Sequence, residues 1–296
     1  MSLVPYDDRD GYIWMDGVML PWRDAKLHVL SHALHYASCV FEGLRVYDGQ
    51  AFKLTEHSER LIASGRLLDI ALPYDVAAID RATRETIAAN GIVDGYVRPV
   101  AWRGAEMMGV AGQECRIHVA IATWVWPPYF TADARLKGIR LDWAKYRRPD
   151  PLTAPTASKA AGLYMICTLS KHAAEAKGYN DALMLDWRGF IAEATGANVF
   201  LGIEGKLHTP TPDCFLDGIT RRTVIGLARA RGIEVIERHI KPEELAQADE
   251  VFLTGTAAEV TPVNTIGEHN FEVGPLGRQM VADFDALVRE PARMAG

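Results

Sequence analysis

The sequence predicts a mixed α/β protein of the α+β kind, built in two parts. Its 296 residues exceed the length at which a single hydrophobic core usually keeps growing. Candidate hairpins and helices follow one another without the regular strand–helix–strand alternation of a parallel sheet. The pair Pro127-Pro128 interrupts this pattern near the middle of the chain. We therefore expect a small N-terminal domain over residues 1–126, a linker over 127–137 and a larger C-terminal domain over 138–296.

The N-terminal half shows the patterns of hairpins and of two capped helices. Asp16-Gly17 is a strong hairpin turn signal, and Asn90-Gly91 can end a helix. Thr55 and Asp75 are of the residue types that cap helix N-termini. The expected elements are a hairpin over 12–22, a helical turn over 31–35, strands over 39–47 and 51–54, helices over 55–67 and 75–89, and strands over 96–102 and 115–126.

The C-terminal half mixes further hairpins with helices that end at glycines. Gly178 and Gly232 suit the left-handed position that follows a helix, and Glu204-Gly205 suits a tight turn. Residues 254–262 are expected to form a turn of small residues after a strand. The other expected elements are strands over 139–143, 181–186, 190–193, 198–203, 206–209, 234–238 and 250–254, and helices over 162–177, 220–230, 242–247 and 275–289.

Composition and charge exclude several classes of protein. The net charge of −6 argues against a nucleic-acid or anionic membrane surface, and Arg147-Arg148 and Arg221-Arg222 are the longest basic runs. No apolar run approaches the roughly 18 residues needed to span a bilayer, and the N-terminus lacks the pattern of a signal peptide. The four scattered cysteines give no zinc or redox spacing. We expect a cytoplasmic enzyme that holds no metal.

Three stretches and one acid could carry chemistry. Lys159 lies among small residues before a predicted helix, although a lysine is more often an exposed surface residue. Gly218 and Thr220 open another helix, whose N-terminus can hold a phosphate. The small residues of 254–262 could hold an anion. Glu193 ends a strand among apolar neighbours and needs a partner there, either an arginine or a ligand cation.

Each of these features is weak alone, but together they match one cofactor. A lysine for a Schiff base, a helix start for a phosphate and a carboxylate for a ring nitrogen are the requirements of pyridoxal phosphate catalysis. In the N-terminal half, Arg98 would lie on the same strand face as Tyr96, and a guanidinium beside aromatic rings suits a carboxylate.

Ordered motifs extend over nearly the whole chain, from near Tyr12 to near Leu287. They are His28-Val29-Leu30-Ser31-His32-Ala33-Leu34-His35-Tyr36, Val40-Phe41-Glu42-Gly43, Tyr96-Val97-Arg98-Pro99, Met108-Gly109-Val110, the segment around Lys159, Gly218-Ile219-Thr220-Arg221, and Gly255-Thr256-Ala257-Ala258-Glu259-Val260-Thr261-Pro262-Val263. With these motifs the sequence resembles a bacterial branched-chain amino acid aminotransferase of the fold-type IV pyridoxal phosphate family. The resemblance implies a smaller N-terminal α/β domain and a larger C-terminal, β-barrel-like α/β domain that binds the cofactor.

The resemblance also implies roles for residues around pyridoxal 5′-phosphate. Lys159 would be the Schiff-base lysine and the proton shuttle, because an amine can act both as nucleophile and as base. Glu193 would face the pyridine nitrogen, and Tyr164, supported by Arg148, would hydrogen-bond the phenolic oxygen. The phosphate would be held by Arg60, Gly218, Ile219, Thr220 and Thr256.

The implied substrates are L-leucine, L-isoleucine and L-valine, exchanged with 2-oxoglutarate in a ping-pong reaction. Arg98, aided by Tyr36, would receive the second carboxylate of glutamate or 2-oxoglutarate. The substrate's own carboxylate would meet Thr256, Ala257 and Ala258. The apolar pocket would be lined by Tyr36, Phe41, Gly43, Tyr96, Met108, Val110, Trp126 and Tyr129. Family members are dimers or larger, so a homo-oligomer is implied.

The sequence departs from the family pattern in two places. Relatives usually read Gly-x-Gly-Glu-Asn after the cofactor carboxylate, whereas this chain has Ala194-Thr195-Gly196-Ala197-Asn198. Ala161 and Leu163 replace a glycine and an asparagine near the lysine. We expect these changes to affect the range of substrates rather than the class of reaction.

Several other functions are alternatives to this one. D-amino acid transaminase, (R)-selective amine transaminase and aminodeoxychorismate lyase share the fold. The features that favour the branched-chain enzyme are the pair Tyr96 and Arg98, Met108-Gly109-Val110 and the turn Thr256-Ala257-Ala258. The presence of Lys159, Tyr164 and Glu193 together argues against a non-catalytic pyridoxal phosphate binder. A hydrolase has little support, because Gly-x-Ser-x-Gly and His-Glu-x-x-His motifs are missing from the sequence. His28, His32 and His35 are therefore interpreted as structural.

Overall fold

The computed structural model describes residues 4–126 and 137–289, which form two compact units. The first unit comprises Met1–Pro127 together with the short segment Ser158–Gly162, and the second comprises the rest of the chain. The segment that carries Lys159 thus packs with the N-terminal residues. The expected domain bounds remain a prediction, and the expected linker lies outside the described residues except for Lys137.

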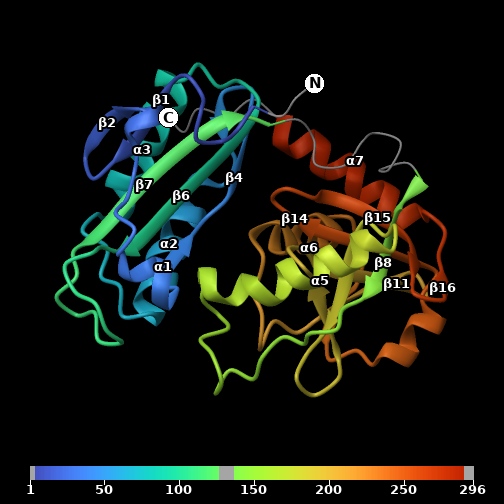
Figure 1. The fold of residues 1–296 in the computed structure, drawn as a ribbon. Coiled ribbons are helices and arrows are strands. Elements are labelled where there is room, and N and C mark those ends of the chain that lie inside the picture. The colour runs from blue at the N-terminus through green and yellow to red at the C-terminus, as the bar shows by residue number, and fades with distance from the viewer. Residues whose placement is uncertain (1–3, 127–136, 290–296) are drawn as a thin grey trace. The chain divides into compact units, whose positions relative to one another are not determined.

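The first unit is built on an antiparallel sheet (Figure 1). The strand order is β2-β1-β7-β6-β4-β5, and β3 also pairs with β6. As predicted, β1 and β2 form a hairpin in which Asp16 and Gly17 both have positive φ. The strands are β1 (Tyr12–Met15), β2 (Val18–Pro21), β3 (Cys39–Phe41), β4 (Leu44–Tyr47), β5 (Gln50–Ala51), β6 (Gly95–Arg103) and β7 (Ile117–Val125).

Helices α2 (Leu54–Leu67) and α3 (Val76–Ala89) pack on one face of this sheet. Their apolar residues, such as Leu61 and Ile79, join sheet residues such as Val97 in one core. The predicted cap of α3 is confirmed, because the Asp75 carboxylate accepts a 2.7 Å hydrogen bond from the Ala78 N–H. Two short helices precede β3: a 3-10 helix over Trp22–Asp24, and α1 (His32–Tyr36), in which His32 is buried.

Three predictions for this unit are wrong. The predicted strand 51–54 is a strand only at Ala51, in β5, and Leu54 already belongs to α2. Thr55 does not cap α2, because the helix begins at Leu54 and the preceding Lys53 has a left-handed backbone. The Thr55 hydroxyl instead donates to Asp80 on α3, at 2.8 Å. The predicted strand 39–47 is two strands, separated at Glu42 and Gly43, where the Glu42 side chain is fully buried.

The second unit contains a six-stranded closed barrel. Strands β10-β9-β8-β15-β14-β11 pair in this order, and β11 pairs back with β10. Three further strands, β12, β13 and β16, extend the sheet to nine. The strands are β8 (Ile139–Trp143), β9 (Asp181–Leu185), β10 (Ile191–Ala194), β11 (Asn198–Ile203), β12 (Lys206–Pro210), β13 (Val235–Arg238), β14 (Glu250–Gly255), β15 (Glu259–Ile266) and β16 (His269–Asn270).

Helices of the second unit pack outside an aliphatic core that includes Leu141, Val199 and Leu253. The helices are 3-10 segments over Ala161–Tyr164 and Pro242–Gln247, α5 (Met165–Ala176), α6 (Ile219–Ala230) and α7 (Pro275–Arg289). None of the helices in the described ranges is both long enough and apolar enough to span a bilayer. The two sheets and the helices packed on them confirm the predicted mixed α/β fold.

Most strand boundaries in this unit differ from the prediction by one residue, and three differences matter more. The 254–262 turn is shorter than expected, because β15 begins at Glu259. Proline is uncommon inside a sheet, yet Pro262 lies in β15 opposite Phe252. Helix α6 begins at Ile219 with Gly218 as its N-cap, so Thr220 lies within the first turn. The helix predicted from residue 162 begins as a 3-10 turn and becomes α-helical at Met165.

Candidate active site

The backbone around Lys159 is fixed to two elements of the first unit. The Lys159 N–H donates to Ser64 Oγ on α2 at 3.0 Å, and the Phe41 N–H donates to the Lys159 carbonyl at 3.2 Å. Ser158, just before the lysine, donates from its hydroxyl to the Ser64 carbonyl at 3.0 Å. The lysine is therefore carried on a segment that both α2 and β3 hold in place.

The Phe41 ring lies close to two cations. Lys159 Nζ is 5.2 Å from the ring centroid, and the Arg98 guanidinium carbon is 4.8 Å from it. Phe41, Lys159 and Arg98 all belong to the first unit. The predicted Schiff-base lysine and the predicted carboxylate-binding arginine are thus brought to the same aromatic side chain.

Arg98 is a partly buried cation on the sheet face that carries Tyr96. Its Nη2 donates to the Tyr96 hydroxyl at 3.3 Å, and its Nε is buried and has no hydrogen-bond partner among residues 4–126 and 137–289. No carboxylate of the described residues forms an ion pair with Arg98. Buried donors normally have partners, so this arginine is suited to an incoming anion.

Gly43 and Trp126 flank Tyr96. A Cβ at position 43 would overlap the Tyr96 hydroxyl, so the glycine is needed for this close approach. The Trp126 ring centroid lies 4.6 Å from that of Tyr96. Trp124, which the sequence analysis did not select, lies 5.4 Å from Tyr96 and 5.6 Å from Trp126. Its position on β7 opposite Tyr96 was the available signal.

The remaining predicted pocket residues of the N-terminal half are not enclosed. Tyr36, Met108 and Val110 have exposed fractions of 43%, 49% and 85%, so they do not form a closed wall within the single chain. Tyr129 lies outside the described residues. On the sheet face beside Arg98 there is a cavity of about 400 Å³ with an apolar lining that includes Cys39, Leu34 and Ala161.

In the second unit, Glu193 is buried at the point where the barrel closes. Its Oε2 accepts a hydrogen bond from Asn198 Nδ2 at 3.2 Å, and the two residues are paired across β10 and β11. Arg148 Nε lies 3.2 Å from Glu193 Oε1, at an angle too poor for a hydrogen bond. Asn198 also donates to the Leu216 carbonyl, at 3.0 Å. The carboxylate therefore has a fixed orientation.

Arg148 is a buried cation surrounded by groups that favour its charge. Burial opposes the charge, but Glu193, the Cys167 thiol and Tyr164 outweigh it and raise the pKa of Arg148. The Cys167 sulfur also accepts a hydrogen bond from Arg148 Nη1 at 3.4 Å. Arg148 thus lies near both Glu193 and Tyr164, two residues with predicted cofactor roles.

The first turn of α6 lies beside the same asparagine. A Cβ at Gly218 would overlap Asn198 Oδ1, so only a glycine fits at this N-cap without displacing the amide. Ile219 and Thr220 follow and are buried. The first N–H groups of an α-helix lack partners within the helix and attract anions. The start of α6 over 218–220 could therefore hold an anion, and the predicted phosphate contacts stay a prediction.

Thr256, Ala257 and Ala258 form the turn between β14 and β15, and all three are partly buried. The Ala258 carbonyl accepts a 2.6 Å hydrogen bond from the Thr261 hydroxyl. Thr254, which the sequence analysis did not assign to the site, has a buried hydroxyl without a hydrogen-bond partner in the described part of the chain. Ala197, where relatives usually have an acid, packs in the barrel core.

Arg60, the predicted phosphate ligand of the first unit, lies on α2 and pairs with Glu42. Its Nε and Nη2 donate to the two oxygens of that carboxylate, at 2.6 and 2.9 Å. His57, one turn earlier on α2, shares the same carboxylate. The sequence analysis gave no role to Glu42 or His57; the buried position of an acid between two apolar strands was the signal for them.

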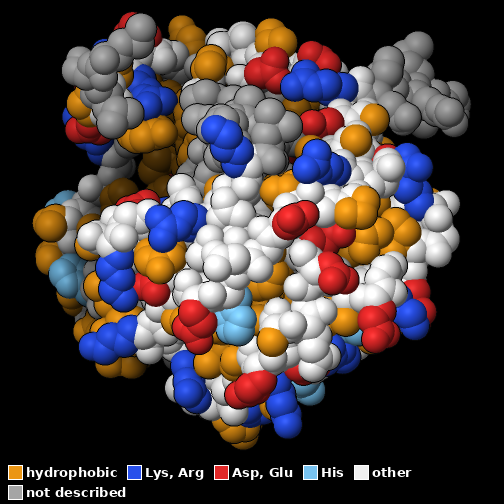
Figure 2. Space-filling model, turned by 90° about the vertical axis from the view of Figure 1, so that its right-hand side faces the viewer, with side chains coloured by type: hydrophobic (Ala, Val, Ile, Leu, Met, Phe, Trp, Pro, Cys, Tyr) orange, Lys and Arg blue, Asp and Glu red, His pale blue; other side chains and the backbone are white. Residues whose placement is uncertain are grey.

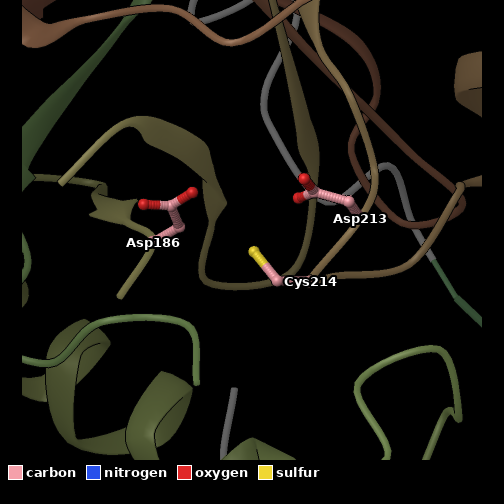
Figure 3. A group of neighbouring side chains, drawn as sticks. All are labelled: Asp186, Asp213 and Cys214. Atoms are coloured by element: carbon pink, nitrogen blue, oxygen red, sulfur yellow. The ribbon is translucent and has the colours of Figure 1, made fainter. Parts of the chain in front are cut away.

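Asp186, Asp213 and Cys214 form a second cluster of possible ligand atoms (Figure 3), all within 4.8 Å of one another. Both carboxylates already have cationic partners: Arg188 Nη2 donates to each, at 2.7 and 2.8 Å, and His239 is hydrogen-bonded to Asp213 at 2.8 Å. Burial and the two acids raise the pKa of the Cys214 thiol to about 12. The cluster is an ion-pair network around Arg188.

Comparison with known proteins identifies the family. The family model "Amino-transferase class IV" matches residues 39–266. The chain belongs to the class IV aminotransferase family. It is 39% identical over 274 residues to the branched-chain-amino-acid aminotransferase of Pseudomonas aeruginosa, covering 91% of this chain and 89% of that protein.

Solved structures of branched-chain amino acid aminotransferases agree over nearly the whole chain. A crystal structure of the Escherichia coli branched-chain amino acid aminotransferase matches with a TM-score of 0.90 and 38% identity, covering 95% of each chain. The branched-chain amino acid aminotransferase of Thermobaculum terrenum, in its holo-form with pyridoxal phosphate, matches with a TM-score of 0.87 and 30% identity, covering 94% of each chain. The resemblance and the fold class predicted from the sequence are confirmed.

Proposed function

We propose that this protein is a pyridoxal-phosphate-dependent transaminase that moves an amino group between L-leucine, L-isoleucine or L-valine and 2-oxoglutarate. The observation that carries the proposal is the pair of cations on Phe41: Lys159 at 5.2 Å and Arg98 at 4.8 Å from its ring centroid. One can act as an amine nucleophile, and the other awaits an anion. The relatives of known name are branched-chain aminotransferases, and one of their structures is a holo-form with pyridoxal phosphate.

The residues present fit the cofactor. Glu193 is a buried carboxylate held by Asn198, with Arg148 beside it, which suits a protonated ring nitrogen. Gly218 has no side chain to cover the start of α6, and the buried first turn of that helix suits a phosphate. The residues that would hold the phosphate are Arg60, Gly218, Ile219, Thr220 and Thr256, and Tyr164 would hydrogen-bond the phenolic oxygen.

When bound, pyridoxal phosphate supplies an aldehyde and a ring that accepts electrons. Lys159 would hold the cofactor through Nζ, and its amine would accept and return a proton at the substrate Cα. Because its backbone is tied to Ser64 and Phe41, the lysine's reach is limited to its own side chain. Glu193 keeps a proton on the ring nitrogen, which favours electron withdrawal from the substrate.

The two substrates have to share one pocket. Thr256, Ala257 and Ala258 bind the carboxylate that both substrates carry. Apolar and aromatic side chains around Tyr96 and Phe41 accept the aliphatic side chain of leucine. Arg98, with Tyr36, binds the second carboxylate of 2-oxoglutarate, so one cation at the edge of an apolar pocket accounts for both half-reactions.

The test is the visible absorbance of the purified protein before and after L-leucine, with Lys159→Ala as the control. We expect a yellow protein that loses its colour with L-leucine and regains it with 2-oxoglutarate, and a variant that does neither. A yellow protein that responds only to D-alanine or an (R)-amine would assign it to a sister activity. A yellow protein that transfers no amino group from any of these donors would be a non-catalytic binder.

The same proposal includes a homo-oligomer, because exposed apolar side chains gather around α1. Leu27, Val29, Leu30, Leu34 and Tyr36 have exposed fractions of 43–69%. A second copy of the chain covering this region would also enclose Tyr36. Light scattering tests the oligomeric state, and Leu34→Glu is expected to lower the mass to that of one chain. A monomeric wild-type protein would contradict this part of the proposal.

The proposed partners are small amino acids and 2-oxo acids rather than nucleic acids. On the face drawn in Figure 2, lysine and arginine side chains alternate with aspartates and glutamates instead of forming a basic patch. A cytoplasmic location also remains part of the proposal, supported by four free cysteines.

A further inference from the structure

Glu42, the residue after β3, is a fully buried carboxylate with two partners on α2, the cation Arg60 and the imidazole of His57. Its Oε1 accepts from Arg60 Nε at 2.6 Å, and its Oε2 accepts from Arg60 Nη2 at 2.9 Å and is 2.7 Å from His57 Nδ1. The Gly43 N–H also donates to Oε2, at 3.2 Å. Glu42, Arg60 and His57 all belong to the first unit, and the Glu42–Arg60 contact is a bidentate ion pair.

The charges in this group can be assigned. Burial alone would raise the pKa of Glu42, but the Arg60 charge and the His57 hydrogen bond outweigh it and hold that pKa well below its usual range. Burial lowers the pKa of His57 against the pull of Glu42, so the imidazole is neutral at pH 7. Since the carboxylate can only accept, His57 Nδ1 carries the proton and donates it.

The geometry fixes the orientation of Arg60. Two donors on one edge of the planar guanidinium are bound to the carboxylate, and a bidentate pair of this kind allows no rotation of the plane. The Arg60 side chain is 16% exposed while Glu42 is 0% exposed, so the arginine extends outward from the buried acid. A lysine at position 60 would keep the charge but not this orientation.

The same face of α2 also holds the lysine. His57, Arg60 and Ser64 follow one another at spacings of three and four residues, which places them on one side of the helix. Ser64 accepts the Lys159 N–H. The candidate phosphate ligand and the anchor of the candidate Schiff-base lysine are therefore one turn apart on a single rigid element.

We propose that Glu42 is a positioning residue, which orients the Arg60 guanidinium for the phosphate of the cofactor. This inference rests on the proposed function and adds a specific role to a residue outside the phosphate site itself. Because Glu42 offsets the charge of Arg60, the arginine contributes directed hydrogen bonds more than net positive charge. Its contribution then depends on orientation, and orientation depends on Glu42.

The test compares pyridoxal 5′-phosphate with pyridoxal, which lacks the phosphate. The full-length protein is freed of cofactor, and both dissociation constants are measured by absorbance titration for the wild type, Glu42→Gln and Arg60→Met. A charged hydrogen bond is worth about tenfold to a hundredfold in binding. We expect Glu42→Gln to weaken phosphate-form binding by about that factor, and to change pyridoxal binding by less than about twofold.

Asp80→Asn is the matched control. Asp80 is also a buried acid against α2, where it accepts hydrogen bonds from Thr55 at 2.8 Å and Ser58 at 2.6 Å, but neither of those is a phosphate ligand. This variant is expected to lower stability without changing the ratio of the two dissociation constants. An equal loss of the ratio in Asp80→Asn would show that Glu42 acts only through the stability of α2, and would overturn the proposal.

The double variant separates this inference from the proposed function. The ratio is the dissociation constant of pyridoxal divided by that of pyridoxal 5′-phosphate, so it measures the preference for the phosphate form. If Glu42 acts through Arg60, Glu42→Gln in the Arg60→Met background lowers this ratio no further. An unchanged ratio in Arg60→Met would remove Arg60 from the phosphate site, and with it the proposal. A lower ratio in Arg60→Met together with an unchanged ratio in Glu42→Gln would refute the role of Glu42 and leave the proposed function intact.

Arg60→Lys covers the case in which Glu42→Gln does not fold. It keeps the charge and the buried acid but loses the bidentate contact. We expect it to lose most of the preference for the phosphate form. Retention of the full wild-type preference would show that charge alone suffices and that positioning by Glu42 is not needed.

Discussion

Gly43 and Tyr96 approach so closely that any side chain at position 43 would overlap the tyrosine hydroxyl. That hydroxyl accepts a hydrogen bond from Arg98. The glycine thus determines where the arginine's partner lies, although it has no functional group of its own. A substitution at position 43 should therefore reach the arginine through the tyrosine.

Gly43→Ala should displace the Tyr96 ring and, with it, the group that holds Arg98. We expect a drop in kcat/KM for 2-oxoglutarate of about tenfold or more, equivalent to about 1.4 kcal/mol. The measurement is steady-state kinetics with L-leucine as donor. Gly226→Ala is the control, because a Cβ at Gly226 on α6 meets nothing within 4 Å. Equal activity of the two variants would contradict the prediction.

Arg98→Met should separate the two half-reactions. The methionine keeps much of the apolar volume but removes the cation, so the affinity for 2-oxoglutarate should fall about tenfold to a hundredfold. The half-reaction with L-leucine, which has no second carboxylate, should change less than about threefold. Single-turnover absorbance with each substrate measures both. A parallel loss in both half-reactions would mean that Arg98 supports the fold of the pocket rather than recognising a carboxylate.

Ser64→Ala should leave the partly buried Lys159 N–H without its acceptor. We expect a loss of about 1–3 kcal/mol in the free energy of unfolding, measured with urea. Ser170→Ala is the matched control, because the Ser170 hydroxyl is buried and has no hydrogen-bond partner in the described part of the chain. Removing that hydroxyl should be neutral or stabilising. A similar loss in both variants would not support a specific role for Ser64.

His57 should make stability depend on pH. Its pKa is lowered in the folded protein, so between the folded value and the ordinary value near 6.5 the unfolded chain binds more protons than the native state. The contribution of His57 to the free energy of unfolding is then complete above about pH 6.5, and it decreases as the pH falls below that value. In His57→Asn, whose amide can still donate to Glu42, the urea-derived free energy should fall less between pH 7 and pH 5. Identical pH slopes for wild type and variant would refute this.

Much of the fold could be predicted because its signals are local. The turn at Glu204 and Gly205 has positive φ at both residues, as its sequence indicates, and Asp75 caps its helix. Strand β15 was missed because Pro262 is a local signal against a strand, and only pairing with β14 and β8 overrides it.

The candidate site divides in the same way. Lys159, Glu193 and Arg98 could be selected because their residue types are unusual in their surroundings. Glu42 and Trp124 were missed, since their signals in the sequence are weak and their importance depends on contacts with residues far away in the sequence, such as Arg60 and Tyr96. The assigned roles of the individual site residues remain predictions, and the experiments above address them.

The closure of the barrel has a consequence for how the enzyme would fail. Strands β10 and β11 meet at the pair Glu193 and Asn198, so the junction that completes the cylinder also orients the carboxylate meant for the cofactor ring. Local opening of a protein starts where few contacts hold it together. Fraying at this junction would release the ring nitrogen's partner while the rest of the barrel stayed folded. Fading of the yellow colour on gentle heating would then precede unfolding and serve as an early report of damage.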